Sequence, residues 1–337
     1  MAPEITPEAR PTTILKHAFG IYDSLAMLAG MQLDLFTPLA DRSMSPSELA
    51  QALGVRPEKL QPLLYALVRA ELLAVKDGHF ANTPEAETYL VRGRPTYMGS
   101  VHELYADLWG ATLNTAQSIR TGVPQAKHDF STMPDEELHA FFRGLHAGTV
   151  AAGHELTRTY DFGRFRRLLD VGGGSGGLAI AACQNCPELI GTVAELPRVA
   201  PITSSFIEEA GLTDRVSVLT ADVVAHAPDG QFDVAVLRSF LQILSPEQAR
   251  RALTHVGQAL EPGGAIFIVG RVLHDSRLSP SETVAFNLVF LNIYDEGQAF
   301  TECEHRTWLT EAGFAEIEIG YDALPGGVSV ITARKRG

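Results

Sequence analysis

A glycine-rich segment directly after an apolar run constrains the fold of this chain more than any other feature. Residues 168–178 read LLDVGGGSGGL: an apolar run that contains Asp170, then six residues rich in glycine, then the start of another apolar stretch. This order is typical of a strand, a tight loop and a helix, where missing side chains let a ligand contact the backbone. The segment therefore predicts a ligand-binding turn at the end of a first β-strand.

Three further features favour S-adenosylmethionine (SAM) over a dinucleotide or a nucleoside triphosphate as the ligand. The spacing GGGSGG differs from GxGxxG, and no phosphate-binding Lys-Ser/Thr pair follows it. Asp170 precedes the glycines, where a carboxylate can meet an amino group. Glu195 ends the next apolar run, where a carboxylate can hold the two hydroxyls of a ribose. We therefore predict a SAM site, with S-adenosylhomocysteine as the product.

The chain from residue 161 to 337 alternates apolar runs with helical stretches, which predicts an α/β domain. Such alternation specifies a Rossmann-like parallel sheet with helices on both faces and the ligand at the carboxyl ends of its first strands. Two last apolar runs, 315–320 and 327–333, predict a hairpin that adds an antiparallel edge strand. The other predicted strands lie at 168–171, 191–195, 216–221, 232–237 and 265–272, with helices that include 200–210 and 246–260.

Residues 1–110 carry helical periodicity and no glycine loop. Two helices, 45–54 and 57–73, precede an Asp77-Gly78 hairpin turn, and this order predicts a winged helix. Winged-helix domains bind DNA in regulators, and in other proteins they mediate dimerisation. The nine Lys/Arg against thirteen Asp/Glu in this segment argue against DNA. We predict a dimerisation domain, followed by linking helices over residues 111–160 that cover the substrate pocket.

Composition excludes several other classes of protein. Three cysteines are too few for a disulfide scaffold, and the Cys183–Cys186 pair has no second pair or histidine cluster to complete a metal site. The net charge of −13 argues against nucleic acid and anionic membranes as partners. There is no apolar run of membrane-spanning length and no signal peptide at the start. We expect a cytoplasmic enzyme without a metal.

Several motifs together resemble the caffeate-type small-molecule O-methyltransferases over essentially the whole chain. They are the winged-helix front, LLDVGGGSGG, AELP at 194–197, ADV at 221–223 and EAGF at 311–314. The resemblance implies a homodimer with intertwined N-terminal helices, SAM as the methyl donor and a small-molecule acceptor. The resemblance also implies which residues bind the cofactor. The glycine loop, with Gly172 and Gly174, lies against the methionine part, where Asp170 is also expected. Glu195 binds the ribose, Asp222 and Val223 flank the adenine, and Arg238 and Ser239 lie beside the cofactor.

The chain departs from the family pattern at the acid–base group. After the fourth strand, the family carries a histidine that deprotonates the substrate hydroxyl. Here the segment reads LQIL, and Gln242 stands in its place; an amide cannot accept that proton. Gly270 and Ala299 stand where the family has the two glutamates that flank the histidine. The sequence therefore predicts no residue with an acid–base role.

A site without a base favours an acceptor that has no proton to lose, such as a thioether sulfur. Among relatives of the family, the bacterial enzyme that S-methylates 4-methylthio-2-hydroxybutyrate on the route to dimethylsulfoniopropionate follows this logic. S-methylation of a thioether acid is therefore the main hypothesis. One alternative is O-methylation of a phenolic or natural-product hydroxyl with a base relocated to His146 or His274. The other is a SAM-dependent rearrangement that transfers no methyl group.

The acceptor pocket is predicted from position. The helix at 138–150 falls where the family places a covering helix, and two aromatic residues one helical turn apart fall at acceptor positions of relatives. A carboxylate on the acceptor would need an arginine partner. The candidate acceptor-binding residues are Phe142, Arg143, Leu145, His146, Arg271, Phe290 and Tyr294.

Overall fold

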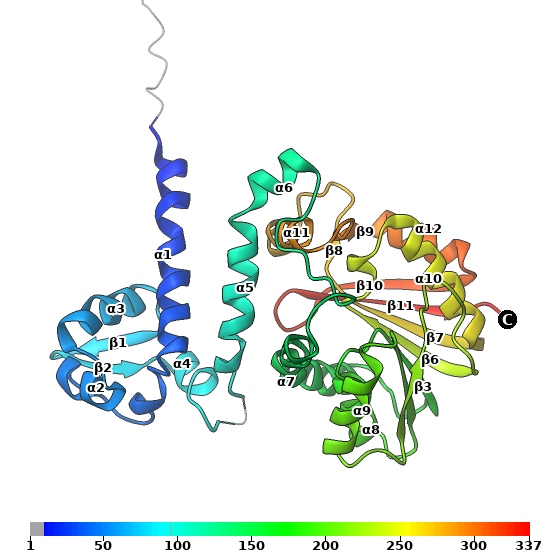
Figure 1. The fold of residues 1–337 in the computed structure, drawn as a ribbon, viewed down its shortest axis with the longest axis horizontal. Helices are drawn as coiled ribbons and strands as arrows, with labels where there is room; N and C mark the ends of the chain where they lie inside the picture. Colours follow the sequence, from blue (N-terminus) through cyan, green and yellow to red (C-terminus); the bar gives the residue numbers. More distant parts are fainter. Residues whose placement is uncertain (1–9, 95) are drawn as a thin grey trace, which may run out of the picture. The chain divides into compact units, whose positions relative to one another are not determined.

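The computed structural model describes residues 10–94 and 96–337, and it divides the chain between Asp107 and Leu108 into two units. The segment 111–160, predicted as linking helices, belongs to the second unit (Figure 1). The two units are described separately.

The N-terminal unit contains the helices and hairpin that the sequence predicts. Ser45 and Glu48 form a capping box, in which Ser45 N–H donates to Glu48 over 2.8 Å and Glu48 N–H donates to Ser45 Oγ over 3.3 Å. Asp77 and Gly78 turn the hairpin with φ of 51° and 77°. The elements are α1 (Thr12–Gln32), η1 (Thr37–Leu39), α2 (Pro46–Leu53), α3 (Pro57–Arg69), β1 (Leu73–Lys76), β2 (His79–Asn82), α4 (Pro84–Tyr89) and η2 (Gly99–Val101), with α5 (His102–Thr112) crossing the boundary.

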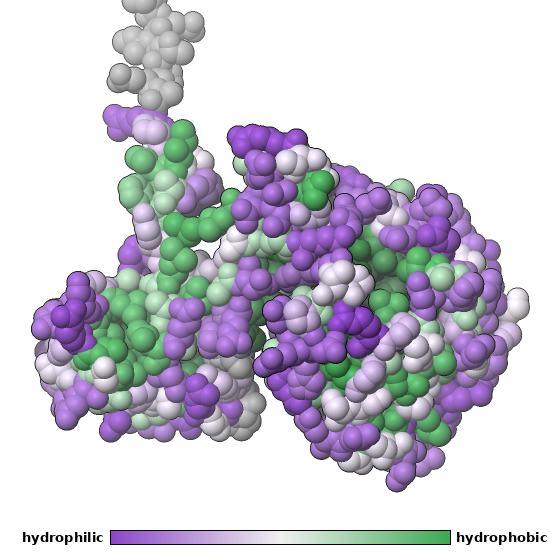
Figure 2. Space-filling model, in the orientation of Figure 1, coloured by the Kyte–Doolittle hydropathy of each residue, from purple (hydrophilic) through white to green (hydrophobic). Residues whose placement is uncertain are grey.

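Helix α1 has an unusually apolar exposed surface. Its Ala26 and Met31 belong to the core of the unit, whereas Ile14, Phe19 and Tyr22 are 71%, 58% and 59% exposed. Figure 2 shows hydrophobic side chains on the surface of this helix. Apolar surface gathered in this way is typical of a site of protein–protein contact.

A seven-stranded sheet forms the centre of the C-terminal unit, in the order β10-β11-β7-β6-β3-β4-β5. The five strands β5, β4, β3, β6 and β7 run parallel to one another. The hairpin β10–β11 joins β7 antiparallel, so the predicted Rossmann-like α/β fold with its antiparallel edge is confirmed. The strands are β3 (Arg167–Val171), β4 (Ile190–Glu195), β5 (Val216–Thr220), β6 (Phe232–Arg238), β7 (Leu260–Gly270), β10 (Phe314–Leu324) and β11 (Val328–Lys335).

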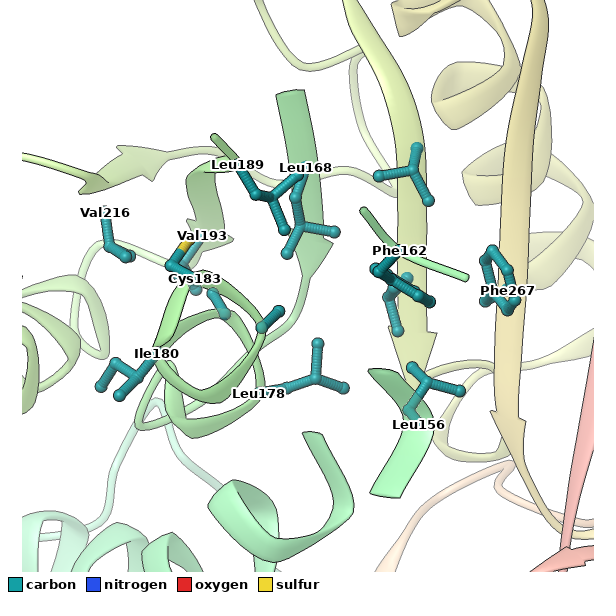
Figure 3. Packing of buried hydrophobic residues seen from close by; sticks show 14 of the residues in the cluster. Leu156, Phe162, Leu168, Leu178, Ile180, Cys183, Leu189, Val193, Val216 and Phe267 are labelled. Carbon is teal, nitrogen blue, oxygen red and sulfur yellow. The ribbon is translucent and has the colours of Figure 1, made fainter. Parts of the chain in front are cut away.

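Helices cover both faces of this sheet. One core contains Leu168 of β3 with side chains of α7 (Asp135–Thr159), α8 (Gly177–Asn185) and α9 (Ala200–Glu209). Figure 3 shows part of it, with Leu178 and Ile180 of α8 near Val193 and Leu168 of the sheet. The other core contains Leu169 with α10 (Pro246–Ala259) and α12 (Glu302–Glu311). Successive strand residues thus point to opposite faces of the sheet. Because helices cover both faces, a ligand can reach the sheet only at the ends of its strands.

Short elements complete the unit. The predicted strand at 265–272 is interrupted at Arg271, because Val272–Leu273 (β8) pairs instead with Phe300–Thr301 (β9). Asn292 of α11 (Ser281–Ile293) accepts a hydrogen bond of 2.8 Å from Ser118 of α6 (Thr115–Thr121). The turn η3 (Leu241–Ile243) follows β6. Within the described ranges, no helix has both the length and the apolar character needed to cross a membrane.

Candidate active site

A cavity of about 390 Å³ lies at the carboxyl ends of β3, β4, β5 and β6. The loops after these four strands and the side chains of α7 form much of its wall. The sheet therefore brings together residues that are far apart in the sequence, as expected for this class of fold. All the residues predicted to bind the cofactor line the cavity: Asp170, Gly172, Gly174, Glu195, Asp222, Val223, Arg238 and Ser239.

The glycine loop requires glycine for both conformation and space. Gly172, Gly174 and Gly176 have φ of 61°, 59° and 70°, a region that side chains disfavour. A Cβ on Gly172 would lie 2.5 Å from Phe240, and one on Gly174 would lie 2.9 Å from Phe142. The loop is thus packed under two aromatic rings, and its backbone lines the cavity.

Glu195 connects the loop after β4 to the glycine loop. Gly174 N–H donates to its Oε1 over 2.7 Å, and Leu196 N–H donates to its Oε2 over 2.9 Å. Burial raises the pKa of Glu195, and the two backbone hydrogen bonds oppose that rise. Each carboxylate oxygen has a further lone pair, so both can also accept from a diol.

The buried Asp170 and the partly buried Arg238 lie beside the loop, and each shifts the pKa of the other through its charge. Ala179 N–H donates to Asp170 Oδ2 over 3.3 Å, whereas Asp170 Oδ1 is buried without a hydrogen-bond partner. Burial raises the pKa of Asp170 to about 7. Burial also lowers the pKa of Arg238, which donates a long 3.5 Å hydrogen bond to Thr149 Oγ1. An ammonium and a carboxylate are the ligand groups that would complement this pair.

Asp222 shapes the wall after β5. Its Oδ1 accepts from Val224 N–H over 2.9 Å and from Ala225 N–H over 3.3 Å. The buried Val223 follows, and its carbonyl lies 2.9 Å from His255 Nδ1. The carboxylate therefore holds the turn while it faces the cavity.

Aromatic side chains gather at the other part of the cavity. Phe130, Phe141 and Phe142 contact one another, with ring centroids 5.2 to 5.7 Å apart. Phe240 and Tyr294 line the same cavity, and burial raises the pKa of Tyr294 to about 12. Such a surface suits a flat aromatic ligand.

Sequence reasoning found only some of these aromatic residues. It identified Phe142 and Tyr294, and it missed Phe130, Phe141 and Phe240. A signal existed for Phe240, which stands two residues after Arg238 at the end of a strand. Phe130 lies in a loop outside any helix or strand, where no periodicity marks it.

Comparison with known proteins now identifies the family. Residues 117–315 match the O-methyltransferase domain, and residues 15–92 match the O-methyltransferase dimerisation domain. The chain belongs to the O-methyltransferase family. It is a SAM-dependent methyltransferase, and its cofactor is the one that the sequence predicts.

Relatives match almost the full length of this methyltransferase. It is 29% identical over 335 residues to 3-hydroxy-5-methyl-1-naphthoate 3-O-methyltransferase of Streptomyces sahachiroi, with 96% of this chain and 95% of that one covered. It is 30% identical over 315 residues to the tetracenomycin polyketide synthesis 8-O-methyl transferase TcmO of Streptomyces glaucescens, with 91% and 92% covered. The solved structure of the SAM-dependent methyltransferase SibL in its apo form has a TM-score of 0.80 and 26% identity, covering 97% of this chain and 100% of that one. These relatives give no support to the predicted thioether acceptor.

Four residues predicted to bind the acceptor lie outside the lining of this cavity, and their role in acceptor binding stays a prediction. Arg143 forms two 2.6 Å hydrogen bonds to Glu209 on the surface. Phe290 is buried in a small core with Leu273 and Ala299. Arg271 lines a separate open groove of about 1080 Å³. His146 forms a hydrogen bond with Ser175 of the glycine loop and does not line the cavity. The other three predicted residues, Phe142, Leu145 and Tyr294, do line it.

Gln242 is held by its neighbours in the chain. Arg271 N–H donates to Gln242 Oε1 over 3.1 Å. That oxygen lies 2.7 Å from where a Cβ on Gly270 would be, so the glycine provides the space for the amide. Ala299 is fully buried, and its N–H donates to Asn287 over 2.7 Å. Gln242 and Gly270 thus pack against each other, and Ala299 is buried in a separate small core with Leu273 and Phe290.

Histidine is absent from the described residues that line the cavity. Of the two candidates for a relocated base, His146 bonds to Ser175, and His274 stacks on Tyr321 with ring centroids 4.1 Å apart. Metal ligands do not gather either: the described residues contain no group of three His, Cys, Asp or Glu that could hold an ion. Burial raises the pKa of Cys183 to about 11, so that thiol stays protonated.

Proposed function

We propose that this methyltransferase transfers the methyl group of SAM to a hydroxyl on an aromatic small molecule. The observation that carries the proposal is one cavity that joins the cofactor-binding strand ends to the cluster of Phe130, Phe141, Phe142 and Tyr294. The names of the two relatives support it, since one is a 3-O-methyltransferase of a hydroxynaphthoate and the other an 8-O-methyl transferase of tetracenomycin polyketide synthesis. O-methylation of a phenolic or natural-product hydroxyl was the alternative hypothesis from sequence, there with a base relocated to His146 or His274. We retain the hydroxyl acceptor without the relocated base, and it replaces the thioether acid as the favoured acceptor.

Bound SAM supplies an electrophilic methyl group, and the residues of the chain hold it in place. Asp170 Oδ1 and the Arg238 guanidinium would bind the amino and carboxylate groups of the methionine part. Glu195 would accept from the ribose hydroxyls, and Asp222 would accept from the adenine amine. The aromatic side chains would hold the acceptor ring in line with the methyl group. Alignment of this kind contributes up to roughly 7–11 kcal/mol to lowering a barrier.

The proton of the hydroxyl remains to be removed, and none of the described residues that line the cavity is a histidine. Asp170 interacts with Arg238 and would bind the amino group of SAM, whereas Tyr294, with a pKa raised to about 12, is protonated near neutral pH and so is not available as a base. The acceptor therefore reacts as an oxyanion that forms by ionisation to water, without a residue acting as general base. This favours acidic hydroxyls, such as those of naphthols that carry electron-withdrawing groups.

An acceptor screen with labelled SAM tests the proposal. It compares hydroxynaphthoates and catechols with an aromatic amine and with 4-methylthio-2-hydroxybutyrate. We expect labelled product from the aromatic hydroxyl compounds, and none from the thioether acid. Turnover of the thioether acid alone would restore the S-methylation hypothesis. Conversion of an acceptor without label transfer would instead favour the rearrangement hypothesis.

The match to a dimerisation domain and the exposed apolar face of α1 further support a homodimer as the active form. In this proposal, α1 of one copy packs its apolar face against a second copy. The acidic balance of the N-terminal segment gives DNA binding no comparable support.

A further inference from the structure

A histidine of helix α7 holds the glycine loop from outside the cavity. His146 Nδ1 lies 2.9 Å from Ser175 Oγ, and Ser175 is 3% exposed within the loop. We infer that His146 is a positioning residue, which sets the conformation of the cofactor loop through Ser175. This inference rests on the SAM site proposed above, and it assigns His146 a role other than that of a base.

The loop is held by three separate elements. Glu195 at the end of β4 accepts from Gly174 N–H over 2.7 Å. Thr203 of α9 donates to Gly174 O over 2.6 Å. His146 provides the bond from α7. The first two fix the backbone of Gly174, so the bond to Ser175 is the contact that orients the next residue.

The contact to Ser175 comes from the helix that also lines the acceptor part of the cavity. Phe142 of α7 packs on Gly174, where an added Cβ would lie 2.9 Å from its ring, and Leu145 and Thr149 line the cavity. A shift of α7 on acceptor binding would therefore reach the cofactor loop through Phe142 and His146. This links the two ligands of the reaction through one helix.

The surroundings of His146 favour the neutral form of the imidazole. Its ring stacks on Phe206 of α9, with centroids 4.4 Å apart. Burial lowers the pKa of His146, and Arg143 on the same helix lowers it further, while Glu209 of α9 raises it. His139 stacks on the same Phe206 ring at 5.8 Å. A neutral imidazole packed on a phenyl ring is a suitable fixed partner for a serine hydroxyl.

Two substitutions separate the hydrogen bond from the ring packing. His146→Asn keeps a polar side-chain atom near the position of Nδ1 and loses the ring. His146→Phe keeps a ring on Phe206 and loses the hydrogen bond. The measurements are calorimetric affinity for S-adenosylhomocysteine, kcat and KM for each substrate, and the melting temperature of the full chain.

We expect His146→Phe to raise the Kd for S-adenosylhomocysteine by roughly 3- to 10-fold, the equivalent of one hydrogen bond, at little change in melting temperature. His146→Asn should lower the melting temperature and keep the Kd within about 2-fold of wild type. Ser175→Ala should match His146→Phe, and the double variant should add no further loss.

Three outcomes would overturn the inference. Equal affinity of His146→Phe and wild type would show that the bond does not position the loop. Affinity losses that follow the melting temperature in both variants would show a merely structural role. Loss of kcat and of the acidic limb of the pH profile, at unchanged affinity, would show that His146 is a base. Failure of wild type to bind S-adenosylhomocysteine would instead overturn the proposed function.

Discussion

Single residues at the cofactor site combine structural and binding roles, and Asp222 shows how the two can be separated. Its Oδ1 holds the turn after β5 through Val224 and Ala225 N–H. Asp222→Ala removes this contact along with the proposed one to adenine. Asp222→Asn keeps an amide oxygen for the turn and replaces the other oxygen with a donor.

We therefore expect both variants to bind S-adenosylhomocysteine more weakly by roughly 1–3 kcal/mol, the cost of a lost buried hydrogen bond. Only Asp222→Ala should also lower the free energy of unfolding, as measured by denaturant titration. Wild-type affinity in Asp222→Asn would contradict a contact between Asp222 and the adenine amine.

Asp170 gives a prediction on pH. Its pKa is raised by burial to about 7 in the folded chain, from an ordinary value of 3.8. The folded state then holds the proton more tightly, so this residue's contribution to stability is present below pH 4 and lost as pH rises through 7. The loss reaches roughly 4 kcal/mol at most, at 1.36 kcal/mol for each pKa unit. Relative to Asp170→Asn, the ligand-free wild type should lose stability over this range.

An ammonium group beside Asp170 would lower that pKa again, so cofactor binding at pH 6.5 should release a proton. Calorimetry of S-adenosylhomocysteine binding in buffers of different ionisation enthalpy measures this release directly. Asp170→Asn is the control, and it should release none from this site. An equal proton count in both proteins would argue against ligand contact with Asp170.

At the scale of elements, the strongest prediction concerns α1, because its apolar face is exposed to solvent in a single copy of the chain. Wild type should sediment at twice the mass of one chain. Phe19→Asp with Tyr22→Asp, at positions 58% and 59% exposed, should shift it to the monomer. Leu278→Asp is the matched control, since Leu278 is 79% exposed in the other unit. A monomeric wild type, or a dimer unaffected by the α1 substitutions, would contradict this role.

Elements also show where sequence reasoning stopped. The strands and the glycine loop were predictable because alternation and glycine are local signals. The sequence did not show in the same way which side chains of α7 point into the cavity. Phe142, Leu145 and Thr149, spaced by three and four residues, line the cavity. Arg143 and His146 lie one residue further along, which turns them by about 100° towards α9 and the glycine loop.

Long-range partners were equally hidden from the sequence. Nothing local to Arg143 indicates Glu209, and nothing near Gln242 indicates that Gly270 leaves space for its amide. The sequence predicted which residues gather at the strand ends, since topology determines that. It did not predict which side chains satisfy one another, because this depends on three-dimensional packing.

At the scale of the whole molecule, we propose that the enzyme transfers a methyl group to an aromatic hydroxyl without a histidine base. The direct test is the pH dependence of kcat/KM for a series of naphthols that differ in hydroxyl pKa. We predict that the inflection of each profile follows the pKa of its own acceptor, because the ionised hydroxyl is the reacting species. A common inflection near pH 6.5, the ordinary pKa of histidine, for every acceptor would contradict this account.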